Sequence, residues 1–300
     1  MIDLHSHTTF SDGSFSVEEL LREAENIDLD VLSITDHNTV DAYKLLKKQD
    51  IRSLFSGIII PGVEITTTYK GEIIEVLGYG FDVETMDKFL KSNVLTFEQK
   101  QLKEYELIKN KYQEIGVIFD TNSIKFDAKK ESSRGYFAAE IKKYPENYKF
   151  FLNEDSITTN TGFTRNELYN PKSPLYVDES SLFPSLEKII EAIHESAGVA
   201  FLAHTFAYSK NISDELLNII NNYDLDGLEC FYTTFTEEQT NYLYKLCKKR
   251  KMHMSGGSDF HGTGKKNHNL GIGHGNLNID YEIIESWANN YIKNIKKYKK

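Results

Sequence analysis

The chain has 300 residues, of which 40% are hydrophobic and 27% are charged. This composition is ordinary for a globular protein, and the length suits one large α/β domain or a domain that carries an insertion. The formal net charge of -10 disfavours a protein that coats long duplex nucleic acid, because that function needs a basic surface. Bound cations would change the charge locally, so an acidic protein can still bind phosphate.

Cysteine usage and hydropathy indicate the compartment. The two cysteines, Cys230 and Cys247, lack C-x-x-C spacing, so neither a disulfide framework nor a cysteine zinc site is indicated. No apolar run approaches membrane length, and Met1 leads directly into an apolar strand without the pattern of a signal peptide. We therefore predict a cytoplasmic protein without a membrane partner. The sequence does not indicate an oligomeric state.

The N-terminal third alternates between strands and helices. Apolar residues at positions 2 and 4 predict a strand, and they place His5 and His7 on one face near its end. A capping box opens a helix over 16–27, a strand follows over 31–35, and a helix follows over 40–48. A further apolar run ends at residue 63, and this strand-helix alternation predicts an α/β fold.

A hairpin and an insertion follow. Two strands over 65–79 flank the turn Lys70-Gly71, and the second strand carries Glu75. The strand-helix rhythm then stops over 83–177, which holds polar helices and an aromatic-rich run but no histidine. We predict that 83–177 is a mainly helical inserted subdomain that covers the active site and selects substrates. Residues 1–82 and 178–300 would then form the main domain.

The alternation of strands and helices resumes after the insertion. Helices are predicted over 185–196, 214–221 and 236–249, and strands over 199–203, 225–231 and 252–258. The strand over 225–231 carries Glu229.

Potential metal ligands stand at the ends of the apolar runs. Two histidines spaced by one residue are weak evidence alone, since such pairs are often structural, but core packing does not require five runs that each end in His, Asp or Glu. A barrel-like α/β fold carries its chemistry at the carboxyl ends of its strands. The residues are His5, His7, Asp12, Asp36, His37, Glu64, His204, Asp259 and His261.

Histidines with carboxylates, and without thiolates, suit Zn, Mn or Fe. A carboxylate such as Glu64 can bridge two ions, and water held by them has a lowered pKa that gives hydroxide near neutral pH. This chemistry suits hydrolysis of phosphate esters. The chain has neither a G-x-S-x-G elbow nor a P-loop, so no competing catalytic motif is present.

These motifs resemble, in order, those of the polymerase-and-histidinol-phosphatase (PHP) family of metallophosphoesterases, over nearly the whole chain. They are His5-Ser6-His7, Ser11-Asp12-Gly13, Thr35-Asp36-His37-Asn38, Gly62-Val63-Glu64-Ile65, Ala203-His204 and Gly257-Ser258-Asp259-Phe260-His261-Gly262. The insertion after Val76-Leu77-Gly78-Tyr79-Gly80 resembles the branch that acts on nucleoside 3′,5′-bisphosphates and on the 5′ ends of short RNA. The resemblance implies a distorted (β/α)7 barrel that holds two or three divalent ions.

The resemblance also implies roles for single residues. His5, His7, Glu64 and Asp259 would hold the first ion, Glu64 and His204 the second, and Asp12, His37 and His261 the third. Asp36 would serve the reaction by orienting ligands. Arg134 would contact the phosphate and help to orient it in catalysis, with Lys172 and Lys265 as further phosphate contacts.

The chain departs from the branch at a few positions. Glu75 stands where the branch has a histidine; a carboxylate there can still bind the second ion and would favour harder metals. Thr205 replaces a proline, and Arg134-Gly135-Tyr136 replaces Arg-Pro-His.

Three alternatives stay open. An amidohydrolase would use a similar barrel, usually with a modified lysine, but no lysine stands at the five strand ends. A histidinol-phosphatase-like enzyme, or another small-molecule phosphatase, would share the ligand set. A non-catalytic metal-binding module is the alternative from a different functional class.

Overall fold

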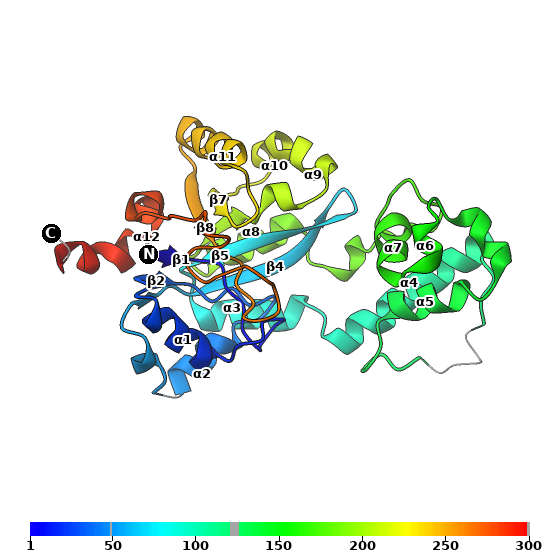
Figure 1. The fold of residues 1–300 in the computed structure, drawn as a ribbon, viewed down its shortest axis with the longest axis horizontal. Coiled ribbons are helices and arrows are strands. Elements are labelled where there is room, and N and C mark those ends of the chain that lie inside the picture. The colour runs from blue at the N-terminus through cyan, green and yellow to red at the C-terminus, as the bar shows by residue number, and fades with distance from the viewer. Residues whose placement is uncertain (49, 121–125, 299–300) are drawn as a thin grey trace. The chain divides into compact units, whose positions relative to one another are not determined.

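The computed structural model describes residues 1–48, 50–120 and 126–298, and of these the side chains as far as residue 293. The chain forms two compact units (Figure 1). The barrel unit comprises Met1–Thr67, Ile73–Ser92 and Ser185–Lys300. The helical unit comprises Thr68–Glu72 and Asn93–Pro184.

Eight strands are described, in two sheets. The first sheet has the order β1 (Ile2–Asp3), β2 (Val31–Leu32), β3 (Ile58–Ile59), and its strands are parallel. The second has the order β4 (Gly62–Tyr69), β5 (Glu72–Tyr79), β6 (Val199–Leu202), β7 (Gly227–Tyr232), β8 (His253–Gly257). In this sheet β5 is antiparallel to β6, whereas β6, β7 and β8 are parallel. The predicted hairpin is confirmed as β4 and β5.

Two backbone bridges join the sheets into a distorted barrel. At one seam His37 pairs with Glu64, and at the other Ser6 pairs with Phe260. The second seam is narrow, since a side chain at Gly257 would collide with the backbone nitrogen of His5. Both seams therefore lie at predicted metal ligands, and the closure of the barrel brings the two ends of the ligand set together.

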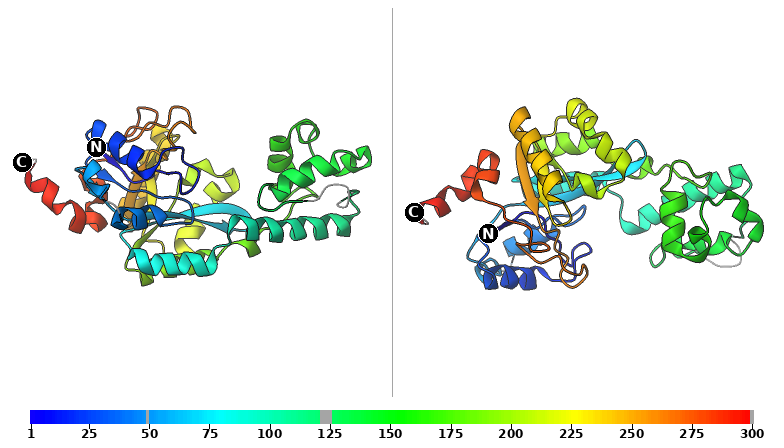
Figure 2. Two further views of the ribbon diagram at one scale, coloured as in Figure 1. Left: turned by 90° about the horizontal axis from the view of Figure 1, so that it is seen from below. Right: turned by 45° about the horizontal axis from the view of Figure 1, so that its top comes forward.

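Helices surround the strands of the barrel unit (Figures 1 and 2). They are α1 (Val17–Asn26), α2 (Asp41–Lys48), η1 (Arg52–Leu54), α3 (Val83–Asn93), α8 (Leu186–Glu195), η5 (Thr205–Ala207), α9 (Lys210–Asp214), α10 (Leu216–Asn222), α11 (Glu237–Arg250) and α12 (Tyr281–Tyr298). The predicted capping box at the start of α1 is confirmed between Ser16 and Glu19. The helix predicted over 214–221 is confirmed as α10, and the short helix α9 before it was not predicted.

The core of the barrel unit connects the first strand with the last helix. Tyr79 is fully buried, donates a hydrogen bond to the carbonyl of Leu4 at 2.9 Å and stacks on Trp287 with ring centroids 5.2 Å apart. The indole of Trp287 donates in turn to the carbonyl of Met254. Figure 2 shows α12 beside the N-terminus of the chain, and Ile2 packs in the same cluster as the apolar residues of α12.

The helical unit has its own core. Phe137, fully buried, makes edge or tilted ring contacts with Tyr105, Tyr112, Phe119 and Tyr136. The helices of this unit are α4 (Phe97–Ile115), α5 (Ser133–Ile141), the 3-10 helix η2 (Pro145–Phe150), α6 (Asp155–Thr158), α7 (Asn160–Phe163), the π-helix η3 (Thr164–Leu168) and the 3-10 helix η4 (Ser180–Leu182).

The sequence-based boundaries of the insertion were 83 and 177, whereas the compact helical unit runs from Asn93 to Pro184 together with the tip of the hairpin. Helix α3 belongs to the barrel unit as far as Ser92. It packs there through buried Met86 and through an ion pair between Asp87 and Lys44 at 2.9 Å.

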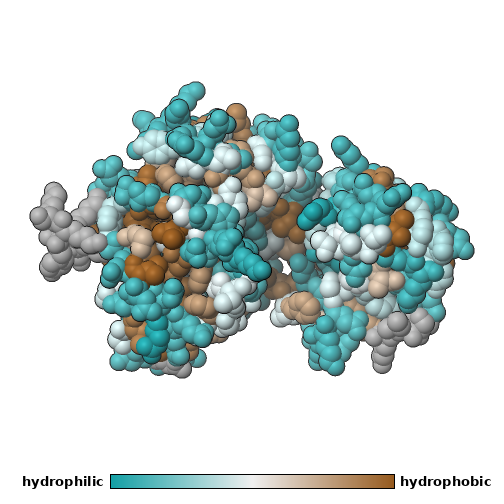
Figure 3. Space-filling model, viewed as in Figure 1, coloured by the Kyte–Doolittle hydropathy of each residue, from teal (hydrophilic) through white to brown (hydrophobic). Residues whose placement is uncertain are grey.

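Polar side chains cover most of the face shown in Figure 3. Among the described residues, none of the helices is long and apolar enough to cross a membrane.

The hydroxyl of Tyr43 fixes the ends of two strands that carry ligands. It accepts hydrogen bonds from the N–H groups of Ile34 and Gly62, at 2.9 and 2.8 Å, and lies 2.7 Å from the carbonyl oxygen of Ile34. Tyr43→Phe would leave both buried N–H groups without this partner, so we expect a loss of about 2–4 kcal/mol in the free energy of unfolding.

Urea unfolding followed by the fluorescence of Trp287, the single tryptophan, would measure this loss in the barrel unit. Tyr242→Phe, which removes a hydroxyl from an exposed side chain, is the matched control and should change the free energy by less than about 0.5 kcal/mol. Equal unfolding midpoints for the two variants would contradict the role assigned to Tyr43.

Candidate metal centre

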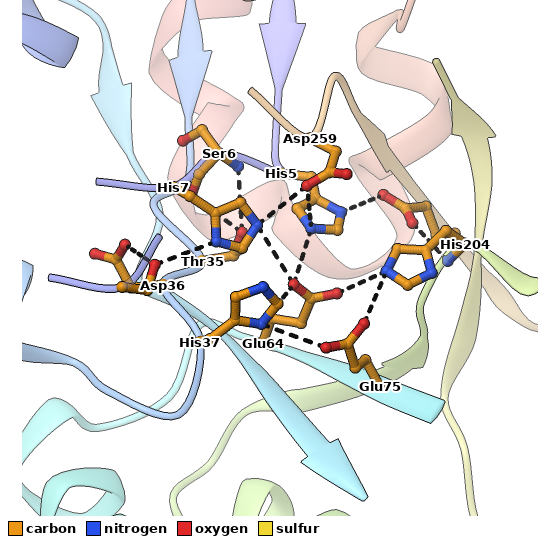
Figure 4. A network of polar contacts seen from close by, with 12 residues as sticks. His5, Ser6, His7, Thr35, Asp36, His37, Glu64, Glu75, His204 and Asp259 are labelled. Atoms are coloured by element: carbon orange, nitrogen blue, oxygen red, sulfur yellow. Dashed lines mark hydrogen bonds and ion pairs between the residues drawn. The ribbon is translucent and has the colours of Figure 1, made fainter. Parts of the chain in front are cut away.

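Nine side chains of the barrel unit point toward one another at the ends of the strands (Figure 4 labels seven of them). All nine were predicted as ligands from the sequence, and they come from seven places along the chain. They are His5 and His7 after β1, Asp12 in the following loop, His37 after β2, Glu64 in β4, Glu75 in β5, His204 after β6, and Asp259 and His261 after β8.

The first group of ligand atoms is fully buried. Nε2 of His5 lies 3.2 Å from Oε2 of Glu64 and 3.5 Å from Oδ1 of Asp259. Nε2 of His7 lies 3.4 and 3.2 Å from the same two oxygens. Two imidazole nitrogens and two carboxylate oxygens therefore converge on one point.

The second group of ligand atoms surrounds the other carboxylate oxygen of Glu64, Oε1. Oε1 of Glu64 lies 2.9 Å from Nε2 of His204, and Oε2 of Glu75 lies 3.3 Å from the same nitrogen. The other oxygen of Glu75, Oε1, lies 3.4 Å from Nδ1 of His37. Glu75 thus stands where the resemblance to the nucleotide branch implies a histidine, and its carboxylate reaches two imidazoles at once.

The third group surrounds Asp12. Its Oδ1 lies 3.2 Å from Nε2 of His261 and 3.7 Å from Nε2 of His37 and from Nδ1 of His7. The side chain of Asp12 is 56% exposed, whereas that of His261 is 3% exposed. This group therefore opens to solvent, and the first group does not.

Burial and charge-charge interactions together set the protonation of the cluster. Burial would raise the pKa of Glu64, but the neighbouring His5 and His37 hold this pKa well below its usual range. Burial would lower the pKa of His204, but the carboxylates of Glu64 and Glu75 raise it to about 10. Burial lowers the pKa of His7 to about 4, so its ring is a neutral ligand at physiological pH.

The donor set fits divalent metal ions. Buried polar atoms in proteins nearly always have hydrogen-bond partners, yet four ring nitrogens of the cluster, Nδ1 of His204 among them, have none among the described residues. The other three are Nε2 of His7, Nδ1 of His37 and Nε2 of His261. Each faces carboxylate oxygens of the neighbouring ligands, as expected of atoms that bind ions. Imidazole and carboxylate donors without thiolates suit borderline and hard divalent ions.

Glu229 positions two of the histidines. Its Oε1 lies 2.8 Å from Nδ1 of His5, and its Oε2 accepts a hydrogen bond from the backbone N–H of His204 at 2.7 Å. A carboxylate on the far nitrogen fixes the orientation of a ligating imidazole and increases its basicity. This role of Glu229 was not predicted; its signal in the sequence is a charged residue inside an otherwise apolar strand.

Two further residues orient Asp259, and one of them, Tyr232, was not predicted from the sequence. The hydroxyl of Tyr232 donates to Oδ2 of Asp259 at 2.8 Å. Lys265, predicted as a phosphate contact, is also brought to this oxygen, with its Nζ 2.6 Å away. The side chain of Lys265 is 41% exposed, so its ammonium group stands at the rim of the cluster.

Asp36 faces the loop after His7 and lies outside the three groups of ligand atoms. Its Oδ1 accepts hydrogen bonds from the backbone N–H of Thr8 at 2.7 Å and from the hydroxyl of Ser11 at 2.7 Å, and its Oδ2 accepts from the hydroxyl of Thr8 at 2.6 Å. The carboxylate therefore holds the backbone between His7 and Asp12.

Arg134 and Lys172 lie in the helical unit. The guanidinium group of Arg134 forms ion pairs with Glu104, at 2.7 Å, and with Glu179, and it stacks on the ring of Tyr169. Lys172 is exposed in the loop after Asn170. Their predicted role as phosphate contacts stays a prediction.

Comparison with known proteins gives a family match. The model of the PHP domain family matches residues 3–233. The chain is 27% identical to a 5′-3′ exoribonuclease of Haemophilus influenzae over 86% of this chain and 89% of that protein. It is 22% identical to a 3′,5′-nucleoside bisphosphate phosphatase of Chromobacterium violaceum over 90% of each.

A crystal structure from Bifidobacterium adolescentis, assigned to the metal-dependent phosphoesterases, superposes with a TM-score of 0.59. It covers 97% of this chain and 95% of that chain at 22% identity, so the likeness concerns the fold. The predicted distorted (β/α)7 barrel is confirmed.

Glu229→Gln tests the positioning of His5 and His204. The amide keeps the shape of the side chain but removes its charge, and its NH2 group cannot accept the N–H of His204. We expect metal affinity to fall about 10- to 100-fold, measured by competition with a chromophoric chelator. Glu237→Gln, at an exposed position on α11, is the control. Equal affinities for both variants would exclude a positioning role for Glu229.

Metal binding should release protons at neutral pH. Because neighbouring carboxylates raise the pKa of His204 to about 10 and that of His5 well above its usual value, both rings are protonated in the metal-free protein at pH 7.5. An ion must displace these protons, so apparent affinity rises with pH. Calorimetric titrations at pH 7.5 in two buffers of different ionisation enthalpy should give different heats; identical heats would contradict the proton release.

Proposed function

The chain belongs to the PHP domain family, and on that premise we propose that it removes nucleotides from the 5′ ends of short RNA by hydrolysing phosphate esters. It is a metal-dependent phosphoesterase of nucleotide-type substrates. The observation that carries the proposal is the cluster of nine candidate ligands. Within it, three sets that share residues each bring their ligand atoms within 4.8 Å of one another: His5, His7 and Glu64; His37, Glu64 and Glu75; and His7, Asp12, His37 and His261.

We assign three ions to these groups. His5, His7, Glu64 and Asp259 would hold the first, Glu64, Glu75 and His204 the second, and Asp12, His37 and His261 the third. When bound, such ions lower the pKa of coordinated water and neutralise charge on the phosphoryl oxygens and on the leaving group. Four carboxylates among the ligands favour Mn²⁺ as the activating metal over Zn²⁺ or Fe²⁺.

The protein itself supplies fixed geometry. Glu229 orients His5, and Asp36 holds the loop between His7 and Asp12, so the ligands need little rearrangement. Asp12, half exposed, places the third group where a substrate can enter. The ammonium group of Lys265, next to Asp259, would bind a phosphoryl oxygen at the same rim.

The helical unit would contribute to substrate selection, with Arg134 and Lys172 as phosphate contacts. Arg134 lines a pocket of about 490 Å³ in this unit together with Arg165, Thr161 and Thr164. For Arg134 to bind phosphate, the phosphate would have to compete with Glu179 for the guanidinium group, because both are bidentate acceptors.

Two relatives favour different substrates. The exoribonuclease of Haemophilus influenzae shares more identical residues with this chain, and we therefore place RNA 5′ ends first. The bisphosphate phosphatase of Chromobacterium violaceum makes 3′,5′-nucleoside bisphosphate the second candidate. Both substrates present a phosphate ester beside a nucleoside, so the same ion cluster serves either.

Product analysis would test the proposal. The protein would be stripped with a chelator, reloaded with Mn²⁺ and given a 5′-phosphorylated RNA oligonucleotide and adenosine 3′,5′-bisphosphate in parallel. We expect stepwise release of mononucleotides from the RNA. His7→Ala and Asp259→Asn should each lower turnover by more than about 100-fold, because each removes a direct ligand of the first ion.

His253→Ala is the matched control, since His253 begins β8 at the end of the strand opposite Asp259. Circular dichroism would show that the fold is intact. If the protein released inorganic phosphate from the bisphosphate and no mononucleotides from the RNA, 3′,5′-nucleoside bisphosphate would be established as the substrate. The phosphoesterase mechanism would be refuted if both ligand variants kept full turnover. It would also be refuted if the wild-type protein, with metal demonstrably bound, hydrolysed neither substrate.

A further inference from the structure

The loop between the ligands His7 and Asp12 is tightly held. The backbone N–H groups of Ser11 and Gly13 both donate to the carbonyl of Thr8 at 3.0 Å, and the N–H of Thr9 donates to the carbonyl of Phe15 at 2.9 Å. The carboxylate of Asp36 holds the same turn from the side of the barrel. Its backbone is therefore fixed by hydrogen bonds in several directions.

This fixed turn presents an exposed aromatic ring. Phe10 is 40% exposed, although its neighbour Thr8 is fully buried. Among the large apolar side chains that are exposed in the described part of the chain, only Phe10 stands within two residues of a metal ligand. Phe15, in the same loop, packs edge-on against Phe260 at 5.3 Å and has a structural partner. Phe10 has no ring partner among the described residues.

The loop is also joined to the segment that carries Lys265. The hydroxyl of Ser14 accepts a hydrogen bond from the backbone N–H of Thr263 at 2.8 Å and lies 3.0 Å from the carbonyl of His261. An aromatic ring, an ammonium group and the solvent-exposed ligand Asp12 thus stand on two connected loops at one rim of the ion cluster.

We propose that Phe10 is the platform on which the nucleobase of the substrate stacks while the phosphate lies at the ion cluster. The inference rests on the proposed function and adds to it a base-binding position in the barrel unit. Every base has a flat π-face, so stacking binds a nucleotide with little preference for its identity. Because hydrogen bonds already fix the turn, stacking immobilises little additional backbone.

The arrangement has a consequence for substrate choice. The ring would select phosphate esters that carry a base over esters of simple sugars, because a ribose phosphate without a base leaves Phe10 exposed to water. It would not distinguish adenine from uracil strongly, as suits an enzyme that removes successive nucleotides from RNA of any sequence.

Kinetics with paired substrates would test the inference. The protein, loaded with Mn²⁺, would be given adenosine 3′,5′-bisphosphate and ribose 3,5-bisphosphate, and separately RNA with a normal or an abasic 5′-terminal nucleotide. Phe10→Ala should raise the KM for the base-bearing member of each pair by roughly 5- to 100-fold and abolish the preference for it. Phe10→Trp should keep the preference.

Tyr242→Ala is the matched control, because Tyr242 is an exposed aromatic residue on α11 outside the cluster, and it should behave as the wild-type protein. Metal content would be measured for each variant. A KM change below about twofold in Phe10→Ala, with full metal content, would overturn the stacking role.

A binding measurement separates this inference from the proposed function. Adenosine monophosphate should bind the metal-loaded wild-type protein more tightly than ribose 5-phosphate does, and it should quench the added fluorescence of Phe10→Trp beyond any change at Trp287. If the wild-type protein cleaves neither substrate, the proposed function fails while this measurement still decides the stacking. Equal affinities of both ligands for the wild-type protein would overturn it.

Discussion

The metal centre depends on the buried carboxylate of Glu64. The side chain is 1% exposed, and its oxygens lie 2.9–3.4 Å from ring nitrogens of four histidines, which are His5, His7, His37 and His204. A charge buried in this way is stable only where cations or donors surround it, because desolvation of a carboxylate costs several kcal/mol. The two oxygens face different groups of ligands, so the position of this one side chain links the first group of the cluster to the second.

The barrel supplies that position through its seams. His37 and Glu64 are bridged in parallel register where the two sheets meet, and Ser6, between His5 and His7, is bridged to Phe260, between Asp259 and His261. Each seam therefore aligns ligands that are distant in the sequence. Glu75 reaches the cluster from within a strand and not from a strand end, because β5 runs antiparallel to β6. The hairpin of β4 and β5 thus brings the carboxylates of Glu64 and Glu75 close together.

The candidate ligands could be identified from the sequence because each of them follows or interrupts an apolar run, and the carboxyl ends of strands meet in a barrel. Glu229 was harder to predict, since its role depends on the register of β7 beside β6, and periodicity alone does not reveal register. The ion-pair partners of Arg134 could also not be predicted from the sequence. Its partner Glu179 is 45 residues away in a region without strand-helix rhythm, and only the folded helical unit brings them together. The helix α9 was not predicted, because its five residues are too few to show helical periodicity.

Glu75 gives the second group a different character from the histidine that the resemblance implies at this position. A neutral imidazole offers one lone pair, whereas the carboxylate of Glu75 reaches His37 with one oxygen and His204 with the other. It also adds a negative charge, which helps to raise the pKa of His204 and so makes protons a stronger competitor of the ion. An ion that prefers oxygen ligands gains most from this exchange, since it interacts with the added charge directly. The substitution therefore ties the choice of metal to the protonation of His204, and both follow from one side chain in β5.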